Sequence, residues 1–215
     1  MFLFFVCNNL HAQNDSVPYS RDFVMKEGIY LTYLDFRSNT PILKNSIKSK
    51  QDREQLDFLV KTLEENDTIT YLLNGKEQRI NTDSLWGFCQ NKTIYINYLK
   101  KFYRIPVFGN ISHFIAAVEI TTYPPASYYN NAAYYNAGAT AIAMPVKSKE
   151  IRQFMLDFYT GRVLDFNAED FTELISRDKK LSDEFNALKR RKQKKLIGVY
   201  LRRYNDAHPV FFPKS

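Results

Sequence analysis

The feature that most constrains the fold is a succession of short apolar segments separated by tight turns between Thr68 and Ile120. Asn74-Gly75 is the dipeptide that a two-residue hairpin turn prefers, because both of its central residues need a positive φ angle. It follows the β-rich segment 68–73, and two further pairs of segments are separated in a similar way: 85–89 and 93–98 around Gln90-Asn91-Lys92, and 102–108 and 111–120 around Gly109-Asn110. This pattern predicts three hairpins in an antiparallel meander that curls into a sandwich or a partial barrel.

Further elements are predicted on both sides of this meander. Gly28 to Tyr33 has the composition of a strand, closed by a turn or a single helical turn over 35–41. A short helix is predicted from Leu56, Leu59, Val60 and Leu63, with Asp52 and Gln55 resembling a capping box, although 58–63 also fits a strand. Residues 154–158 and 162–166 flank Tyr159-Thr160-Gly161 and predict one more hairpin.

Residues 167–209 are predicted to be helical. Asn167 can cap a helix that extends through Ser176, with Phe171, Leu174 and Ile175 spaced three and four apart. A second, longer helix is predicted to pass without a break through the basic run Lys189–Lys195, until residues 205–209 end it. Strands first and helices last indicate an α+β fold, with the helices packed on one face or end of the sheet.

The N-terminus resembles a secretory signal peptide. Residues 1–12 contain no charged side chain, Phe2 to Val6 form a short apolar core, and Gln13 is a plausible first mature residue. The missing positive n-region suggests that the true start lies upstream or that the chain was clipped. A buried apolar strand is the alternative. A lipid anchor at Cys7 is less favoured, because Val6 stands where a lipobox needs a small residue.

These patterns divide the chain into four parts within one domain. Residues 1–12 form the signal peptide, 13–26 a flexible mature N-terminus, 27–166 a β-rich core and 167–209 the C-terminal helices. Only Cys89 remains after cleavage, so the mature chain cannot form an internal disulfide, and a small buried hydrophobe is its favoured role. An apolar content of 45% excludes global disorder. No later stretch is long and apolar enough to span a membrane.

The sequence contains no recognised catalytic or metal-binding motif. After residue 12 the histidines are His113 and His208, and neither lies in a metal-ligand spacing. No nucleophile elbow and no glycine-rich phosphate loop occurs. We therefore predict no catalytic residue, metal ligand or cofactor, and the lack of motifs favours a protein that is not an enzyme.

Two segments are candidates for binding. Residues 121–143 are predicted to be a loop rich in Tyr, Asn and Ala, in which Tyr128, Tyr129, Tyr134 and Tyr135 are the candidate ligand-binding residues, because tyrosine combines an apolar face with a hydroxyl. A lid over the sheet and a disordered loop are the alternatives. The basic run Lys189–Lys195 has six positive charges in seven residues. A solvated helix face, favoured by the carbonyl end of the helix dipole, is preferred there over contact with a membrane surface.

Several motifs together resemble a family of uncharacterised exported proteins common in Bacteroidetes. They are Gly28–Leu31, Asp35–Pro41, Leu85–Phe88, Phe102–Ile105 with Gly109, and Tyr204–Pro209. The resemblance covers most of the mature chain and implies export, but no reaction, ligand or functional residue. It also draws attention to three Asp-(Ser/Thr)-aliphatic tripeptides that resemble O-glycosylation sequons, at Ser16, Thr68 and Ser84, of which Ser16 lies in the segment predicted to be flexible.

The sequence thus predicts an exported protein of the periplasm or cell surface, with a binding or structural role rather than a catalytic one. The sequence does not specify a partner; a glycan or an envelope component is one candidate, and export removes the usual nucleic-acid partners. A hydrolase of envelope or dietary polymers, with unidentified carboxylates, is the alternative.

Overall fold

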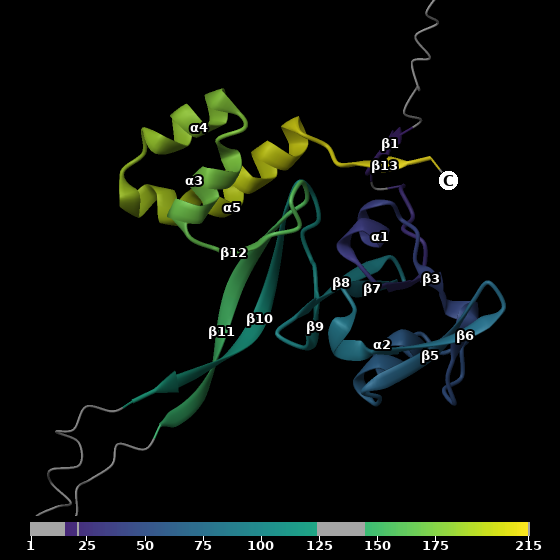
Figure 1. Cartoon of the computed structure of the whole chain (residues 1–215). Coiled ribbons are helices and arrows are strands. Elements are labelled where there is room, and N and C mark those ends of the chain that lie inside the picture. Colours follow the sequence, from purple (N-terminus) through teal and green to yellow (C-terminus); the bar gives the residue numbers. More distant parts are fainter. Residues whose placement is uncertain (1–15, 21, 124–144, 215) are drawn as a thin grey trace, which may run out of the picture.

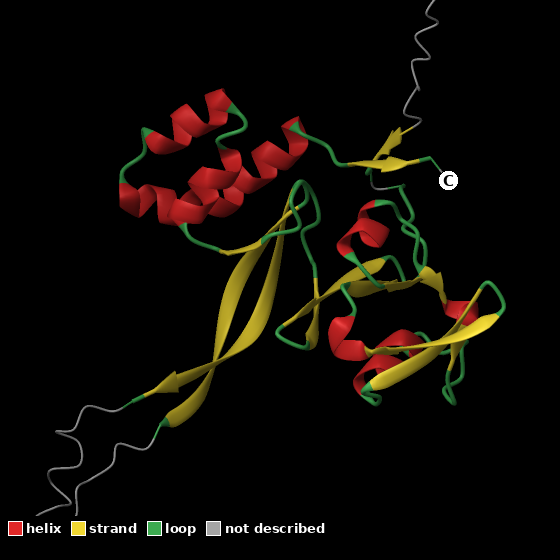
Figure 2. Ribbon diagram, viewed as in Figure 1, coloured by secondary structure: helices red, strands yellow, loops and turns green. Residues whose placement is uncertain are grey.

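The computed structural model describes residues 16–20, 22–123 and 145–214 (Figure 1). Within them the chain forms four antiparallel sheets and two groups of helices (Figure 2). Two sheets are three-stranded, with the orders β4 (Ile47–Lys48), β5 (Thr68–Leu73), β6 (Lys76–Asn81) and β10 (Ile111–Thr122), β11 (Val146–Asp157), β12 (Val163–Asp165). A five-stranded sheet has the order β3 (Ile42–Leu43), β2 (Gly28–Tyr30), β7 (Gly87–Gln90), β8 (Thr93–Tyr98), β9 (Lys101–Arg104). The termini pair as β1 (Ser16–Pro18) with β13 (Phe211–Pro213).

The helices are short in the first half of the chain and gathered at its end. The first half holds α1 (Tyr33–Arg37), α2 (Phe58–Glu64) and two 3-10 turns at 44–46 and 82–84. The second half ends in α3 (Ala168–Ile175), α4 (Lys179–Asn186) and α5 (Arg190–Ala207). Antiparallel open sheets followed by C-terminal helices confirm the predicted α+β class.

The sheet β10–β11–β12 separates two hydrophobic clusters. Its residues Ile111, Met155 and Leu164 are buried against α3, α4 and α5. Phe114 and Phe154, which face the other way, join the central cluster with Tyr30, Phe36 and Phe212. A third cluster surrounds α2, where Phe58, Leu59 and Leu63 pack against Ile47, Ile69 and Phe88.

The first two predicted hairpins are present. Asn74 and Gly75 have φ angles of 51° and 77°, and β5 pairs with β6 from Thr68↔Asn81 to Leu73↔Lys76. Asn91 and Lys92 also adopt positive φ, at 49° and 59°, between β7 and β8. Two consecutive positive φ angles give the turn whose twist matches that of the paired strands. The last predicted hairpin, β11–β12 around Tyr159-Thr160-Gly161, is present as well.

The third predicted hairpin, around Gly109-Asn110, is wrong. The chain already turns at Leu99 and Lys100, with φ angles of 53° and 65°, so β9 pairs back onto β8. Only the isolated bridge Val107↔His113 joins the two predicted partners, and β10 pairs instead with β11 along twelve residues. Asn110 acts as a joint between elements, since its Nδ2 donates to His208 O at 2.6 Å.

The strand predicted over 28–33 ends earlier, at Tyr30, because Thr32 begins a helix. The hydroxyl of Thr32 accepts from Asp35 N at 3.2 Å, while Asp35 Oδ2 accepts from Thr32 N at 2.8 Å, which forms a capping box. The helix predicted from 56–63 is α2, but it begins at Phe58. The Asp52 side chain accepts from Glu54 N at 3.0 Å in a turn before it, and Leu56 stays 79% exposed.

The long second helix predicted at the C-terminus is two helices, because the chain breaks over 187–189. The ring of Phe185 packs on that of Tyr200, with centroids 5.1 Å apart. An unbroken helix rises 1.5 Å per residue and would place these two residues about 22 Å apart. The basic run therefore lies in the first turns of α5, and the predicted support from the carbonyl end of the dipole is wrong. The predicted α3 is present, with Asn167 Oδ1 accepting from Glu169 N and Asp170 N at 2.9 Å.

The segment before β2 differs from the flexible N-terminus that the sequence indicates. Ser16, Val17 and Pro18 pair with residues 211–213, and Tyr19 N donates to Val210 O at 2.7 Å. Phe23 stacks on Phe212 with ring centroids 4.9 Å apart. The polar composition of 14–26 gives no sign of this pairing or of the contact between Phe23 and Phe212, because both depend on residues 211–213 at the other end of the chain.

Candidate functional site

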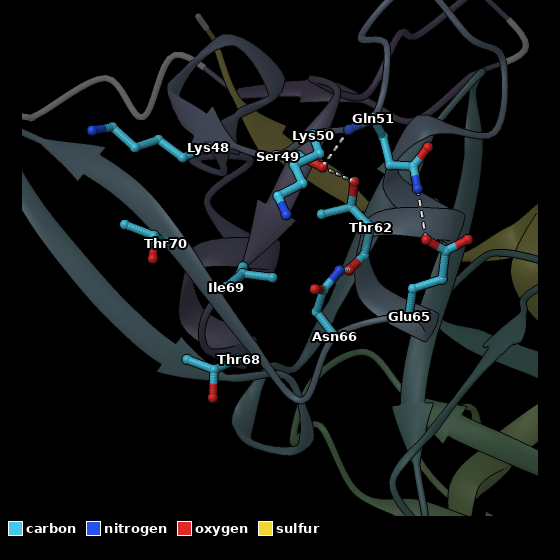
Figure 3. Close-up of a pocket in the computed structure, with 10 residues that line it drawn as sticks. All are labelled: Lys48, Ser49, Lys50, Gln51, Thr62, Glu65, Asn66, Thr68, Ile69 and Thr70. Carbon is cyan, nitrogen blue, oxygen red and sulfur yellow. Dashed lines mark hydrogen bonds between the residues drawn. The ribbon is translucent and has the colours of Figure 1, made fainter.

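Two neighbouring hollows flank the end of α2. The first has a volume of about 500 Å³ and lies between the segment after β4, the second half of α2 and the start of β5 (Figure 3). The second, of about 430 Å³, lies between the loop after α2, the 3-10 turn at 82–84 and β9. Asn66 lines both hollows, which makes them adjacent parts of one candidate surface.

The first hollow is lined by hydroxyl, amide and ammonium groups. Its polar residues are Lys48, Ser49, Lys50, Gln51, Thr62, Glu65, Asn66, Thr68 and Thr70. Ser49 Oγ and Thr62 Oγ1 lie 3.0 Å apart, and Gln51 Nε2 donates to Glu65 Oε2 at 2.6 Å. These bonds tie the segment after β4 to α2, so the walls of the hollow are held by the fold.

Asn66 and Lys50 present the polar atoms most open to a ligand there. Asn66 Nδ2 donates to Thr62 O at 2.8 Å, and Figure 3 shows the amide oxygen directed away from the helix into the hollow. The Lys48 ammonium is engaged in an ion pair with Glu77 on β6. In Figure 3 the Lys50 ammonium points toward the middle of the hollow.

The second hollow adds the aromatic ring of Phe102, whereas the ring of Tyr103, the next residue on β9, faces the other side of the sheet and joins the central cluster. Phe102 and Tyr103 are half-buried, and the ring of Phe102 packs edge-on against Phe88 with centroids 5.2 Å apart. Tyr103 OH donates to Ala117 O at 3.1 Å, which fixes the ring against β10. Asp83 is paired with Lys100 Nζ at 3.0 Å.

The combination suits a polyhydroxylated ligand. Aromatic faces pack on the C–H faces of sugar rings, and hydroxyl and amide groups hydrogen-bond with the ring hydroxyls. Within the described ranges, no group of three or more His, Cys, Asp or Glu side chains is placed to hold a metal ion.

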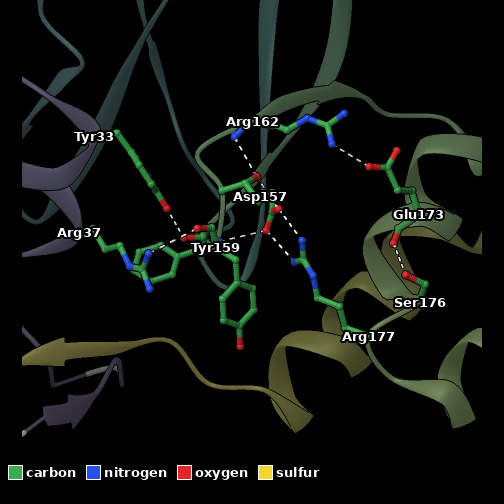
Figure 4. A network of polar contacts seen from close by, with 10 residues as sticks. Tyr33, Arg37, Asp157, Tyr159, Arg162, Glu173, Ser176 and Arg177 are labelled. Atoms are coloured by element: carbon green, nitrogen blue, oxygen red, sulfur yellow. Dashed lines mark hydrogen bonds and ion pairs between the residues drawn. The ribbon is translucent and has the colours of Figure 1, made fainter. Parts of the chain in front are cut away.

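A separate polar network lies around Asp157, at the turn between β11 and β12 (Figure 4). The buried Asp157 carboxylate accepts from Arg177 Nη1 and Nη2 at 2.8 and 2.6 Å and from Thr160 Oγ1 at 2.6 Å. Burial alone raises the pKa of Asp157, but the hydrogen bonds from Arg177, Thr160 and the Tyr159 N–H outweigh it, so the pKa is lowered.

The same network joins three parts of the molecule. Tyr33 OH donates to Phe158 O, Arg37 Nη1 donates to Tyr159 O at 3.4 Å, and Arg177 lies over the Tyr159 ring. It thereby connects α1, the β11–β12 turn and the segment between α3 and α4. The Asp157 carboxylate is thus fully engaged by Arg177 and Thr160, which indicates a structural rather than a reactive role.

The sequence-predicted site residues are scattered over the molecule. Tyr128, Tyr129, Tyr134 and Tyr135 lie outside the described residues. Ser16, Thr68 and Ser84 are all exposed, on β1, at the start of β5 and in the 3-10 turn, and Thr68 also lines the first hollow. Cys89 is buried on β7, and burial together with the nearby Glu27 raises the pKa of its thiol to about 12.

The hollows themselves were missed in the sequence. Their linings come from residues between 48 and 103, and no single motif of the sequence brings those residues together. The sequence indicates only that a loop follows the helix predicted over 56–63, because Asn66 and Asp67 are residues typical of loops.

Comparison with known proteins identifies the family. Residues 28–208 of this α+β chain match the family described as "Family of unknown function (DUF6563)". Because the match covers most of the sequence, the chain belongs to this family, and the predicted membership in a family without an assigned function is confirmed. Neither the curated proteins nor the solved structures include a match. No helix in the described ranges is both long and apolar enough to cross a membrane.

Proposed function

We propose that this protein is an exported, non-enzymatic binding protein that holds a glycan across the two hollows beside α2. The observation that carries the proposal is that Asn66 lines both hollows, so that hydroxyl and amide groups in one are continuous with the half-buried ring of Phe102 in the other. Export rests on the signal-like N-terminus and remains a proposal.

A binding role has more support than the hydrolase alternative. Hydrolysis of a glycosidic bond requires two carboxyl groups that face each other across the ligand. Of the carboxylates that line the second hollow, Glu64, Asp67 and Asp83, the last is engaged in an ion pair with Lys100.

The test is binding of defined oligosaccharides, measured by titration calorimetry, with cellohexaose, maltohexaose and a peptidoglycan-derived tetrasaccharide as probes. We expect the double variant Asn66→Ala/Lys50→Ala to weaken binding by about tenfold or more, because it removes two hydrogen-bonding groups. Asn45→Ala/Lys76→Ala is the matched control, because it removes the same two group types at exposed positions outside both hollows.

A second variant separates the hollows from the Tyr-rich segment. Replacement of Tyr128, Tyr129, Tyr134 and Tyr135 by alanine should leave binding unchanged if the hollows hold the ligand. Loss of binding in this variant, with retention in the Asn66/Lys50 variant, would assign binding to the Tyr-rich segment and contradict the proposal. The absence of binding to all three probes would also contradict it.

Modification at Ser16, Thr68 and Ser84 stays a prediction of the sequence. Exposure of all three side chains meets the first requirement for a modifying enzyme, although Ser16 lies in a paired strand rather than in the flexible segment predicted. Thr68 lines the first hollow, so a sugar there would compete with the proposed ligand.

A further inference from the structure

The outer face of α5 is a basic surface. Exposed cations extend along the first four turns of the helix: Lys189 at the N-cap, then Arg190, Arg191, Lys192, Lys194, Lys195 and Arg202. The opposite face holds Ile197, Tyr200, Leu201 and Tyr204, which are buried against the sheet and the other helices. With 3.6 residues per turn, Arg191, Lys192, Lys195 and Arg202 therefore project away from the protein on one side.

Within the part of the chain that the structure describes, these cations have no acidic partners. None of them forms an ion pair among the described residues, whereas Arg203, on the flank of the same helix, is paired with Glu184 at 2.6 Å. From Lys189 to Asn205 the sequence contains no Asp or Glu, and Asp206 follows only at the far end of the helix.

The arrangement opposes the stability of the helix that carries it. Arg190 and Lys194, and likewise Arg191 and Lys195, are like charges four residues apart, which repel on a helix surface. The run also lies at the positive end of the helix dipole, and the Lys189 side chain provides no cap hydrogen bond. A helix face that is only solvated would be more stable with mixed charges. The interpretation of this run as a solvated face favoured by the helix dipole therefore loses its support.

We propose that the basic face of α5 docks the protein on the surface of an anionic phospholipid membrane. Clustered lysines and arginines on one face of a surface helix are attracted by a layer of lipid phosphates. The apolar side of α5 is already used by the protein core, so the contact is electrostatic and reversible and does not insert the helix. This inference does not depend on the proposed glycan site, which lies on other elements.

Lipid is favoured over nucleic acid by the shape and chemistry of the face. The cations lie on the convex side of a single helix, and Val199, 46% exposed, lies among them. The outward positions carry no aromatic ring on which a base could stack, since Tyr200 and Tyr204 are buried. A broad layer of lipid phosphates therefore fits this surface better than a nucleic-acid strand, which needs a groove to hold it.

The test is co-sedimentation of the full chain with vesicles of phosphatidylcholine containing roughly one-third phosphatidylglycerol. We expect binding at low salt, at least about tenfold weaker binding when the ionic strength is raised to 0.3 M, and no binding to phosphatidylcholine alone. Binding to both vesicle types, or no binding to the anionic ones, would overturn the proposal.

Matched variants assign the binding to this face. Arg191→Gln/Lys192→Gln/Lys195→Gln should lower vesicle affinity by about tenfold or more. Lys76→Gln/Lys147→Gln/Lys149→Gln removes the same net charge from exposed positions on β6 and β11 and should leave most of the binding. Equal losses in the two triple variants would show a nonspecific effect of net charge and refute the assignment.

Two further measurements keep the outcome unambiguous. The α5 variant removes like-charge repulsion, so its melting temperature should be at least that of the parent chain, and a loss of binding is then not a folding failure. Duplex DNA of random sequence serves as the competing partner. Binding of DNA with the same dependence on the α5 cations, but no binding to vesicles, would replace the lipid assignment.

Discussion

At the scale of single residues, Asn39 shows how one side chain can hold several segments together. It is 2% exposed, follows α1 and has a φ angle of 52°, which asparagine tolerates better than other non-glycine residues. Its Oδ1 accepts from Tyr30 OH and from Lys26 N, both at 3.0 Å. Asn39 therefore joins β2, α1 and the segment before β2.

We expect Asn39→Ala to lower the free energy of unfolding by about 2 kcal/mol, because the part-buried Lys26 N–H loses its acceptor and the backbone keeps a positive φ angle, whereas Tyr30 OH keeps Lys26 O as an acceptor at 3.0 Å. Asn74→Ala, in the exposed turn between β5 and β6, is the matched control and should cost only about 1 kcal/mol, from φ alone. Urea unfolding measures both values. Equal effects would mean that the Asn39 hydrogen bonds contribute little.

At the scale of elements, α4 and α5 show how helix boundaries depend on both caps and packing. Asp178 caps α4 by accepting from Leu181 N at 3.0 Å, and its Oδ2 lies 2.9 Å from His208 Nε2 at the end of α5. By contrast, Lys189 precedes α5 with an extended backbone and no cap hydrogen bond from its side chain. The start of α5 is therefore determined by the packing of Phe185 on Tyr200 rather than by a capping signal.

The variant Lys189→Asp should raise the free energy of unfolding by about 1 kcal/mol, because aspartate can cap the first N–H groups and is favoured at the positive end of the dipole. Thermal melting at low and high salt measures the gain, which should shrink but persist at high salt. Lys180→Asp, within the first turn of the capped helix α4, controls for the change in net charge. A larger gain there would refute the capping argument.

At the scale of the whole molecule, three clusters with few connecting groups make stability depend on a small number of polar contacts. The Asp157–Arg177 pair joins the sheet β10–β11–β12 to the helices. On β10, His113 Nε2 lies 2.9 Å from Gln153 Oε1, and the imidazole ring packs at a tilt against Phe166. The pKa of Asp157 is lowered by its hydrogen bonds, which outweigh the effect of burial. The pKa of His113 is lowered by burial.

Both shifts predict that acid destabilises the protein in two stages. A group with a lowered folded-state pKa contributes stability above its unfolded pKa and loses it as the pH falls through the folded pKa. For His113 this loss begins below about pH 6.5, and for Asp157 below about pH 3.9. Urea midpoints from pH 8 to pH 3 should follow this course, and His113→Gln should flatten the first stage. An unchanged profile in that variant would remove His113 as the cause.

The sequence by itself determined the elements whose signals are local. Asn74-Gly75 and Asn91 favour turns because glycine and asparagine accept positive φ angles, and Asn167 starts α3 through its own side chain. The tertiary structure decided the pairings that no local turn signal predicts. The turn at Leu99-Lys100 contains neither Asn nor Gly, yet β9 pairs there with β8, and β2 pairs with β7 far along the chain.

The candidate surfaces divide in the same way. The charge of Lys189–Lys195 is visible in the sequence, but its place at the start of α5 and its lack of ion pairs depend on how α4 folds back. The hollows beside α2 draw residues from 48 to 103, and only the packing of β4, α2, β5 and β9 brings them together. Short-range propensities define elements, whereas a binding surface is made by burial between residues far apart in the chain, which a local pattern cannot encode.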